Sequence, residues 1–237
     1  MTKRSSRFLP RSFWHDLTQA IWQPLFPSLL LVIIICGGFT IGFIYQTQST
    51  LNLQNYGLTH LLGGYLIGIN REIIPFFVAI IILLVAGLSY ASESANMKST
   101  EQIQLIEMAG IDPVDYLVGP RLIAGIGLTI SLTVFGWLSS FIGGCLVCRW
   151  MHVDMIGFMQ AARSFFQYSF LWIGLLKALV NGIIIGLVPA LCGLLLKINH
   201  SSDVRRATIF AAALSLILLT VAFFIFSIMI QYSGSVL

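Results

Sequence analysis

Three charged side chains stand in or beside long apolar stretches of this sequence: Arg71, its neighbour Glu72, and Lys177. A charge at membrane depth is costly, so such a residue usually faces a bundle interior or a water-filled cavity. A guanidinium can hold a phosphate group through paired hydrogen bonds, and a carboxylate can hold a cation. Since neighbours in a helix point about 100° apart, Arg71 and Glu72 need not pair with each other. The two residues indicate either a binding site for a charged group or an interfacial anchor for a helix.

Lys177 lies in an apolar run of its own, over residues 168–196. Its long side chain can extend toward the membrane surface, or its ammonium can pair with a carboxylate of a second copy of the chain across a dimer. The sequence leaves open whether Lys177 has such a structural role or contacts a ligand directly.

A second concentration of polar residues is the stretch NMKSTEQIQLIEMAGIDPVDYLVGPRL, residues 96–122. It holds four of the nine acidic residues in the chain: Glu101, Glu107, Asp112 and Asp115. The residue order predicts a short helix over 99–109, because Ser99 can cap its start while Gln102 completes a capping box. Gly110 suits the left-handed conformation that often follows the last turn of a helix.

A second short helix is predicted to follow directly. Asp112 can cap its first turn, Pro113 suits the first helical position, and Asp115 places a negative charge where the helix dipole favours one. The Gly-Pro pair at 119–120 is expected to end this helix. Arg121 is expected to mark the membrane boundary.

The first of these helices has an apolar side, formed by Ile103, Leu105, Ile106, Met108 and Ala109. Helices with defined starts, stops and faces suit a rigid surface for another protein better than a loose connection. The alternative is a helix lying on the bilayer, but an acidic segment is poorly matched to an anionic inner leaflet. We therefore favour a protein partner for this stretch.

The composition places the chain in a membrane. Of its 237 residues, 57% are hydrophobic and 9% are charged, and the mean hydropathy is +0.92. Soluble domains carry about 25% charged residues, so this chain lacks the polar groups to cover a globule. The net charge of +4 does not indicate nucleic-acid binding, because the basic residues are scattered at membrane boundaries without interleaved aromatics.

We expect an all-α integral membrane protein, a single domain over residues 1–237 with five transmembrane helices. A helix crosses a bilayer with roughly 20 apolar residues. The predicted spans are 28–45, 73–90, 122–147, 168–196 and 207–230. Asn70 and Pro75 are expected to interrupt the long apolar region before the second span. The polar segment 98–118 then connects the second and third spans.

Ahead of the first span, residues 8–26 are predicted to form an amphipathic helix in the membrane interface. Trp14, Leu17 and Ile21 recur there at helical spacing, with basic residues just upstream. A disordered cytoplasmic tail is the alternative. We do not expect a cleaved signal peptide, because no clean apolar core and small-residue cleavage site follow the first basic residues.

Basic residues predict the orientation, because they concentrate in short cytoplasmic connections. With the N-terminus cytoplasmic, that side receives Lys3, Arg4, Arg7, Arg11, Lys98, Arg121, Lys197, Arg205 and Arg206. The opposite side receives Arg149 and Arg163. We therefore expect the 98–118 segment in the cytoplasm and the C-terminus on the other side.

Cysteine spacing does not indicate a metal site. Cys145 and Cys148 form a C-x-x-C, but no second pair and no histidine at ligand spacing accompany them. All four cysteines lie in apolar runs, which favours buried thiols over disulfides. Glycine pairs at 38/42, 64/68 and 182/186 have the GxxxG spacing that allows close helix packing.

The stretch from Arg71 to Gly125 resembles the MlaE/YrbE permease family, the membrane subunits of ABC transporters that move phospholipids between membranes. The family pattern runs approximately R-E-L-G-P, then A-E-(I/L)-G-x-M-(K/R)-x-T-E-Q-(I/L)-x-(A/S)-(L/M)-E-x-M-x-(V/I)-(D/N)-P, then P-R. The matching positions are Arg71, Glu72, Pro75, Glu93, Met97, Lys98, Thr100, Glu101, Gln102, Glu107, Met108, Asp112, Pro113, Pro120 and Arg121. Weaker similarity at Lys177, 192–193 and 204–208 extends the resemblance over nearly the whole chain.

The chain also departs from this pattern. Ile74 replaces a glycine, residues 84–87 lack an arginine, and Ser94 displaces the glycine that follows the family's glutamate. Residues 204–209 differ from V-G-R-A-T-T, and an acidic residue of the last span is replaced near Phe223. The polar stretch matches the family better than the intramembrane polar positions do.

The resemblance implies that residues 98–110 form a coupling helix that docks into a cytoplasmic ATPase. The expected coupling residues are Lys98, Thr100, Glu101, Gln102, Ile103, Leu105, Ile106, Glu107, Met108, Asp112 and Pro113. It also implies a homodimer and a periplasmic partner with MCE domains. The chain has no G-x-x-x-x-G-K-[ST] loop, so we expect ATP and magnesium on the partner ATPase, and no catalytic residue, cofactor or metal on this chain.

The resemblance also places the membrane charges at the mouth of a lipid cavity, with Arg71 positioned for a phosphate. The expected lipid-binding residues are Arg71, Glu72, Tyr65, Leu66, Phe76, Phe77 and Ile80. Packing between helices is the alternative role for the apolar members of this set.

Together these features favour a permease subunit for phospholipid or a related lipid in a bacterial inner membrane. Two other classes stay open. An autonomous secondary transporter is suggested by the charges near the membrane, and a scaffold for an MCE lipid tunnel is suggested by the lost intramembrane polar positions.

Overall fold

The computed structural model describes residues 11–51, 59–110, 112–152, 155–163, 168–196 and 201–234. Within these ranges every regular element is a helix and no strand occurs. Five helical segments are long and apolar enough to cross a membrane: Trp14–Ser49, Leu62–Ser99, Pro113–Trp150, Leu171–Leu195 and Asp203–Met229. The predicted all-α, multi-pass membrane architecture is confirmed.

The first span is carried by α1 (Arg11–Leu51), which is one continuous helix. This differs from the predicted separation between an interfacial helix, 8–26, and a span beginning at 28; residues 8–10 lie outside the described ranges. Pro24 lies inside α1, where neighbouring helices and small local adjustments can satisfy the freed backbone groups. Leu17, on the apolar side of the predicted interfacial helix, packs into the main hydrophobic core. The amphipathic pattern therefore reflects packing on the bundle as well as contact with the membrane surface.

The second span is built from five consecutive segments: α2 (Thr59–Gly68), η1 (Ile69–Ile73), α3 (Ile74–Ile82), η2 (Leu83–Gly87) and α4 (Leu88–Ser99). The η segments are π-helical turns. The expected break at Asn70 and Pro75 is wrong, because the widened turn of η1 absorbs it. Asn70 Nδ2 donates to the carbonyl of Leu66 at 2.9 Å, and Pro75 occupies the start of α3, where a proline is tolerated.

The remaining elements are α5 (Gln102–Met108), α6 (Pro113–Trp150), α7 (Met155–Arg163), α8 (Tyr168–Leu195) and α9 (Ser201–Gly234). The predicted end of a helix at 119–120 is wrong, since α6 runs through Pro120 without a break. α8 and α9 agree with the fourth and fifth predicted spans. The short helix α7 follows the third span and was not predicted.

Close packing of α6 against α8 depends on glycines. A Cβ at Gly186 would lie 2.6 Å from the Cα of Leu122, and one at Gly125 would lie 2.8 Å from the carbonyl oxygen of Gly182. Only backbone without side chains can approach this closely. The pair 182/186 therefore has the packing role that its spacing predicts, whereas added Cβ atoms at 38/42 and 64/68 would meet nothing within 4 Å.

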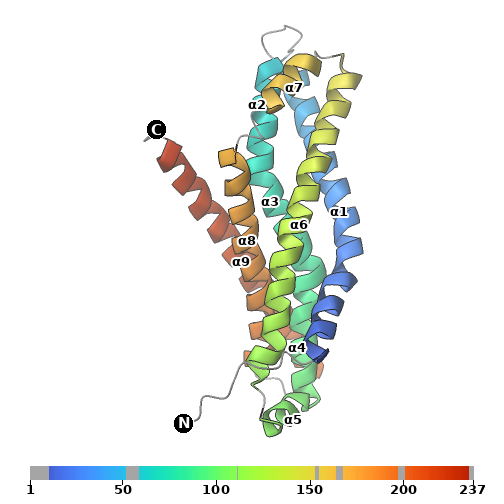
Figure 1. Cartoon of the computed structure of the whole chain (residues 1–237), viewed down its shortest axis with the longest axis vertical. Helices are drawn as coiled ribbons and strands as arrows, with labels where there is room; N and C mark the ends of the chain where they lie inside the picture. The colour runs from blue at the N-terminus through green and yellow to red at the C-terminus, as the bar shows by residue number, and fades with distance from the viewer. Residues whose placement is uncertain are drawn as a thin grey trace.

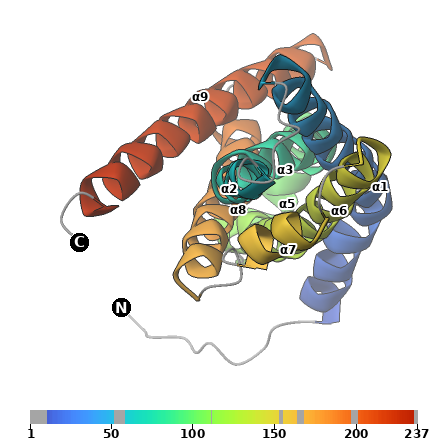
Figure 2. The same ribbon diagram turned by 90° about the horizontal axis from the view of Figure 1, so that it is seen from above.

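The bundle has two distinct ends (Figure 1). α5 and the beginning of α1 lie at one end, while α2 and α7 lie at the other, next to each other. Figure 2 shows that α9 is tilted outward, so that its C-terminal part moves away from the other helices. The polar segment between the second and third spans and the N-terminal part of the chain are thus on the same side of the membrane.

Candidate functional site

The charged residues of the second span form one cluster around the carboxylate of Glu72. Its Oε1 accepts a hydrogen bond from Arg71 Nε at 3.0 Å. Its Oε2 accepts from Lys177 Nζ and from Ser227 Oγ, the latter at 2.9 Å. The cluster therefore joins η1 to α8 and α9. The expectation that Arg71 and Glu72 need not pair is corrected, because the long arginine side chain turns back to its neighbour.

The two cations of this cluster differ in how far their side chains are buried. The Lys177 side chain is 3% exposed, whereas those of Arg71 and Glu72 are 27% and 21% exposed. Lys177 thus pairs with a carboxylate of its own chain, whereas the predicted alternatives were a carboxylate across a dimer or extension to the membrane surface. Arg71 is the cation that a ligand can approach, because its side chain is more exposed than that of Lys177.

The π-helical turn η1 is fixed in place by α6. Trp137 Nε1 donates to the backbone carbonyl of Asn70 at 2.9 Å, and both side chains are buried. A π-turn shifts the following residues around the helix axis, and such turns are frequent at functional sites. This turn sets the direction in which Arg71 and Glu72 leave the helix.

The predicted apolar lining residues are not brought together on one surface. Phe76 lies beside the cluster, with its ring 4.8 Å from that of Phe223, which Lys177 Nζ approaches to 5.8 Å. Phe77 and Tyr65 instead pack against rings of α1, and Leu66 is buried in a separate core cluster near α7. Ile80 is half-buried. Of these five, only Phe76 is placed beside the charges.

Phe223 occupies the position near which the family pattern has an acidic residue. In this chain its ring lies against Phe76 and under the ammonium of Lys177. An aromatic face attracts a cation through its quadrupole, although more weakly than a carboxylate does. Glu72 therefore supplies the negative charge that Lys177 needs.

At the opposite end, α5 is fully accessible. None of its residues is buried, and Leu105 and Met108 are 61% and 75% exposed. Ile103 attaches α5 to the bundle, because its side chain packs against the cluster that contains Leu117 and Leu194. The remaining members of the predicted coupling set are exposed at Thr100, Glu101, Gln102, Glu107 and Asp112, and half-buried at Lys98, Ile106 and Pro113.

The start of α5 differs from the predicted capping box. Ser99 ends α4 and donates to the carbonyl of Asn96 at 2.8 Å, while Glu101 occupies the cap position with φ 59° and no side-chain cap. A left-handed conformation is unfavourable for a residue other than glycine, so the turn before α5 is held by its surroundings. Lys98 supplies one such contact, since its ammonium donates to the carbonyls of Leu194 and Leu196 at the end of α8.

The predicted roles of Gly110, Asp112 and Pro113, which follow α5, are confirmed. Gly110 has φ +76°, as its predicted role requires. Asp112 caps α6, accepting from the backbone N–H of Val114 at 2.9 Å, and Pro113 occupies the first turn. α5 is therefore a short helix between two defined turns.

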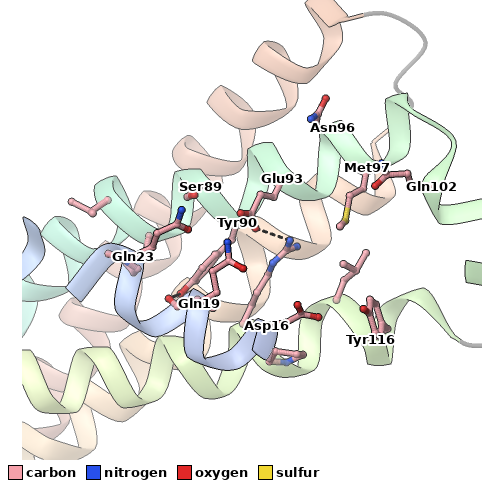
Figure 3. Close-up of a pocket in the computed structure, with 17 residues that line it drawn as sticks. Asp16, Gln19, Gln23, Ser89, Tyr90, Glu93, Asn96, Met97, Gln102 and Tyr116 are labelled. Carbon is pink, nitrogen blue, oxygen red and sulfur yellow. Dashed lines mark hydrogen bonds and ion pairs between the residues drawn. The ribbon is translucent and has the colours of Figure 1, made fainter. Parts of the chain in front are cut away.

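Arg121 does not mark the membrane boundary as predicted but is buried within the bundle, with a side chain 7% exposed. Its Nη2 donates to Glu93 Oε2 at 3.0 Å and its Nη1 donates to Ser94 Oγ (Figure 3). The guanidinium lies 6.0 Å from the ring of Tyr90, whose hydroxyl donates to the carbonyl of Ala20 at 2.9 Å. These contacts join α1, α4 and α6 to one another at the end of the bundle where α5 lies.

Sequence reasoning matched Glu93 and Arg121 to family positions without pairing them. The need for a partner could have been inferred from energetics. Burying the charge of Arg121 is costly, so this side chain requires a partner within the bundle. Among the described residues, no three His, Cys, Asp or Glu side chains gather as a metal site requires. The four cysteines are free thiols.

Comparisons with known proteins agree with this arrangement. The family model described as "Permease MlaE" matches residues 17–229. A "Probable ABC transporter permease protein" of Synechocystis is 30% identical over 214 residues, which cover 88% of this chain and 80% of that protein. The "Intermembrane phospholipid transport system permease protein MlaE" of Haemophilus influenzae is 30% identical over 145 residues, 59% of this chain and 54% of that protein.

A plant protein extends the comparison. "Protein TRIGALACTOSYLDIACYLGLYCEROL 1, chloroplastic" of Arabidopsis thaliana is 25% identical over 216 residues, which cover 90% of this chain and 61% of that protein. The matched family model spans all five membrane-crossing segments, from α1 to α9. This chain belongs to the MlaE permease family.

Proposed function

We propose that the chain is the permease subunit of an ABC transporter that moves phospholipid or a related lipid between membranes. The observation that carries this proposal is α5, a short accessible helix held rigidly at the ends of two membrane spans. Leu105 and Met108 expose apolar surface there beside the acidic residues Glu101 and Glu107. Such a helix suits a groove in a partner protein, as in other helix-in-groove complexes.

The rigid attachment of α5 gives a route for mechanical coupling. Lys98 ties the segment before α5 to the end of α8, and Ile103 packs on the cluster formed by α6 and α8. Because α4 and α6 continue directly into the membrane, a force on α5 is transmitted to the spans. ATP hydrolysis, with its magnesium, takes place on the partner ATPase, and this chain itself is not an enzyme.

The cluster of Arg71, Glu72 and Lys177 supports an anionic headgroup as the group that is moved. Its two cations attract a phosphate, and a guanidinium can form parallel hydrogen bonds to a phosphate. Ser227 anchors this cluster to α9, the outermost and most tilted helix, so movement of α9 changes the cluster directly. In this mechanism the ATPase alternately opens and closes the site through α5.

The assembly that fits this function is a homodimer with two ATPase subunits and a periplasmic MCE-domain protein, in a bacterial inner membrane. The N-terminus and α5 lie on the cytoplasmic side, and the C-terminus lies on the periplasmic side. In support, the described basic residues Lys98, Arg205 and Arg206 lie near helix ends on the α5 side, at the end of α4 and the beginning of α9. Lys3, Arg4, Arg7 and Lys197, also assigned to that side, lie outside the described residues.

A charge reversal on α5 tests this proposal. Glu107→Lys should weaken co-purification of the ATPase at least tenfold, because opposed charges at an interface cost several kcal/mol. The matched control is Arg163→Glu, an exposed charge reversal on α7 at the other end of the bundle. Equal ATPase recovery with both variants would argue against docking at α5.

A further inference from the structure

A polar cavity of about 510 Å³ lies at the α5 end of the bundle, between α1, α4 and α6. Figure 3 shows Asp16 and Gln19 of α1 facing Tyr90 and Glu93 of α4 across it. The cavity is separate from the Glu72 cluster. Glu72 and Glu93 lie 21 positions apart along one continuous helical span, which corresponds to about 30 Å at the rise of a helix.

The walls of this cavity change from polar to apolar with depth. Since α1 runs away from the α5 end and α4 runs toward it, the shallow wall contains Asp16, Asn96 and Gln102. The deep wall contains Pro24 and Ala86, both of which are buried. A polar entrance over an apolar floor matches an amphiphile whose headgroup lies at the membrane surface.

Aromatic residues on α1 place the cavity at headgroup depth. Trp14 and Trp22 are 57% and 60% exposed, and they bracket Asp16 and Gln19 on the same helix. Exposed tryptophans concentrate where a membrane helix passes through the interface between water and hydrocarbon. Lipid headgroups of the leaflet on the α5 side therefore lie level with the cavity.

The charges of the cavity favour a cation. Arg121 is already satisfied by Glu93 Oε2 and Ser94 Oγ, so its positive charge is balanced by Glu93. Asp16 also attracts Arg121, so two carboxylates face one guanidinium and leave one excess negative charge among the described side chains of the cavity. Within the described residues, Asp16 has a close basic neighbour in the exposed His15, at 3.9 Å. Glu93 Oε1 accepts no hydrogen bond within the described part of the chain. A primary ammonium, with three N–H donors, can use both carboxylates.

Amide side chains complete the site. Within the described part of the chain, the amides of Gln19, Gln23 and Gln102 make no side-chain hydrogen bond, and all three line the cavity. Amide N–H groups can donate to phosphate oxygens without adding charge. The cavity therefore offers acceptors for an amine and donors for a phosphate.

We propose that this cavity binds the amine-bearing headgroup of a zwitterionic phospholipid from the leaflet on the α5 side. The ammonium lies between Asp16 and Glu93, the phosphate faces the amides, and the glycerol and acyl chains pass over Pro24 and Val85 toward the bilayer. This binding goes beyond the proposed transport function, because it requires neither an ATPase nor the Glu72 cluster.

Native mass spectrometry of the purified full chain in detergent tests the proposal. Phosphatidylethanolamine should bind at least tenfold more tightly to the unaltered chain than to Asp16→Asn, since a hydrogen bond to a charged group contributes about 1.5–3 kcal/mol. The control is Asp115→Asn, which removes an exposed carboxylate at the same end outside the cavity and should leave the affinity unchanged. Asp16 is partly exposed, so its substitution leaves the fold intact, which thermal unfolding checks.

Three comparisons identify the ligand. Phosphatidylglycerol should bind equally well to the unaltered chain and to Asp16→Asn. Glycerophosphoethanolamine, the headgroup without acyl chains, should bind at least tenfold more weakly than the lipid, and equal binding would identify a soluble amine and overturn the lipid assignment. Asp16→Asn should remove one bound lipid per chain that Arg71→Ala retains, since Arg71→Ala leaves the buried pair of Glu72 and Lys177 in place.

Other results contradict the proposal. If Asp16→Asn and Asp115→Asn bind phosphatidylethanolamine equally, the cavity does not select the amine. If Asp16→Asn leaves lipid binding intact but weakens binding of the partner ATPase, the cavity receives a basic side chain of that protein instead. Either outcome overturns the amine-selective lipid site proposed here, whereas docking at α5 is tested separately by Glu107→Lys.

Discussion

Glu72 balances the charges within the membrane. Its carboxylate accepts hydrogen bonds from Arg71, Lys177 and Ser227, which belong to three different elements. The Lys177 side chain is only 3% exposed, and Glu72 is the one carboxylate that pairs with it within the described part of the chain. Stability at this point therefore depends more on Glu72 than on either cation.

Removing the charge of Glu72 should destabilise the chain more than removing the charge of Lys177. Glu72→Gln leaves Lys177 buried beside Arg71 without a counter-charge, which should destabilise the chain by about 3–5 kcal/mol. Lys177→Met should cost less, because Glu72 keeps Arg71 and Ser227 as partners. The double variant Glu72→Gln/Lys177→Met should recover most of the loss. Thermal unfolding in detergent measures the series, and equal losses for the two single variants would refute this order.

The sequence predicts which residues carry charge in the membrane but not how they pair. Arg71 and Glu72 were identified from their cost in an apolar region, and the contact of Glu72 with Lys177 links positions more than a hundred residues apart. The partners of Arg121 likewise could not be predicted from the sequence. A local pattern placed it at a membrane boundary, whereas its partners Glu93 and Ser94 reach it only after α4 and α6 have packed together.

At the scale of elements, α6 and α8 pack with their backbones in direct contact. Gly125, Gly182 and Gly186 let the two backbones meet where any side chain would collide with main-chain atoms. Backbone atoms cannot move aside as a flexible side chain can. This contact sets the position of α8, and with it the position of Lys177.

An alanine at Gly186 should therefore separate the helices. Its Cβ would lie 2.6 Å from the Cα of Leu122, and such overpacking costs about 1–3 kcal/mol. Gly42→Ala is the control, since its Cβ would meet nothing within 4 Å and alanine favours a helix by about 1 kcal/mol over glycine. Gly186→Ala should lower the unfolding temperature while Gly42→Ala leaves it equal or higher. A similar decrease for both would show that α6 and α8 are not held at this distance.

Helix ends were predictable where the signal is local, and helix interruptions were not. Gly110 and Asp112 act through their own backbone conformation and nearest N–H groups, so their roles follow from residue type. Pro120, and Asn70 together with Pro75, were expected to interrupt helices, because a proline lacks the backbone N–H that a helix uses. Inside a membrane bundle the helix continues through both, with a π-turn at Asn70, and neighbouring helices cover the defect.

At the scale of the whole molecule, two groups of functional residues lie far apart along the same span. The Glu72 cluster lies within the membrane near the tilted helix α9, and α5 lies beyond the opposite end of that span. The five-span fold was predictable from apolar run length alone, whereas the tilt of α9 and the presence of α7 depend on tertiary contacts. α4 connects the two groups, and the Arg121 network ties it to α1 and α6 on the way.

The most direct test measures ATP-dependent lipid transfer by the chain reconstituted in liposomes with its ATPase and periplasmic partner. Arg71→Ala should lower both transfer and lipid-stimulated ATP hydrolysis at least tenfold, because a charge-assisted hydrogen bond to phosphate contributes about 1.5–3 kcal/mol. Arg149→Ala, which removes an exposed arginine at the end of α6, should leave both rates unchanged. If the two variants transfer lipid equally well while the complex stays assembled, the Glu72 cluster is not the site where the lipid is held.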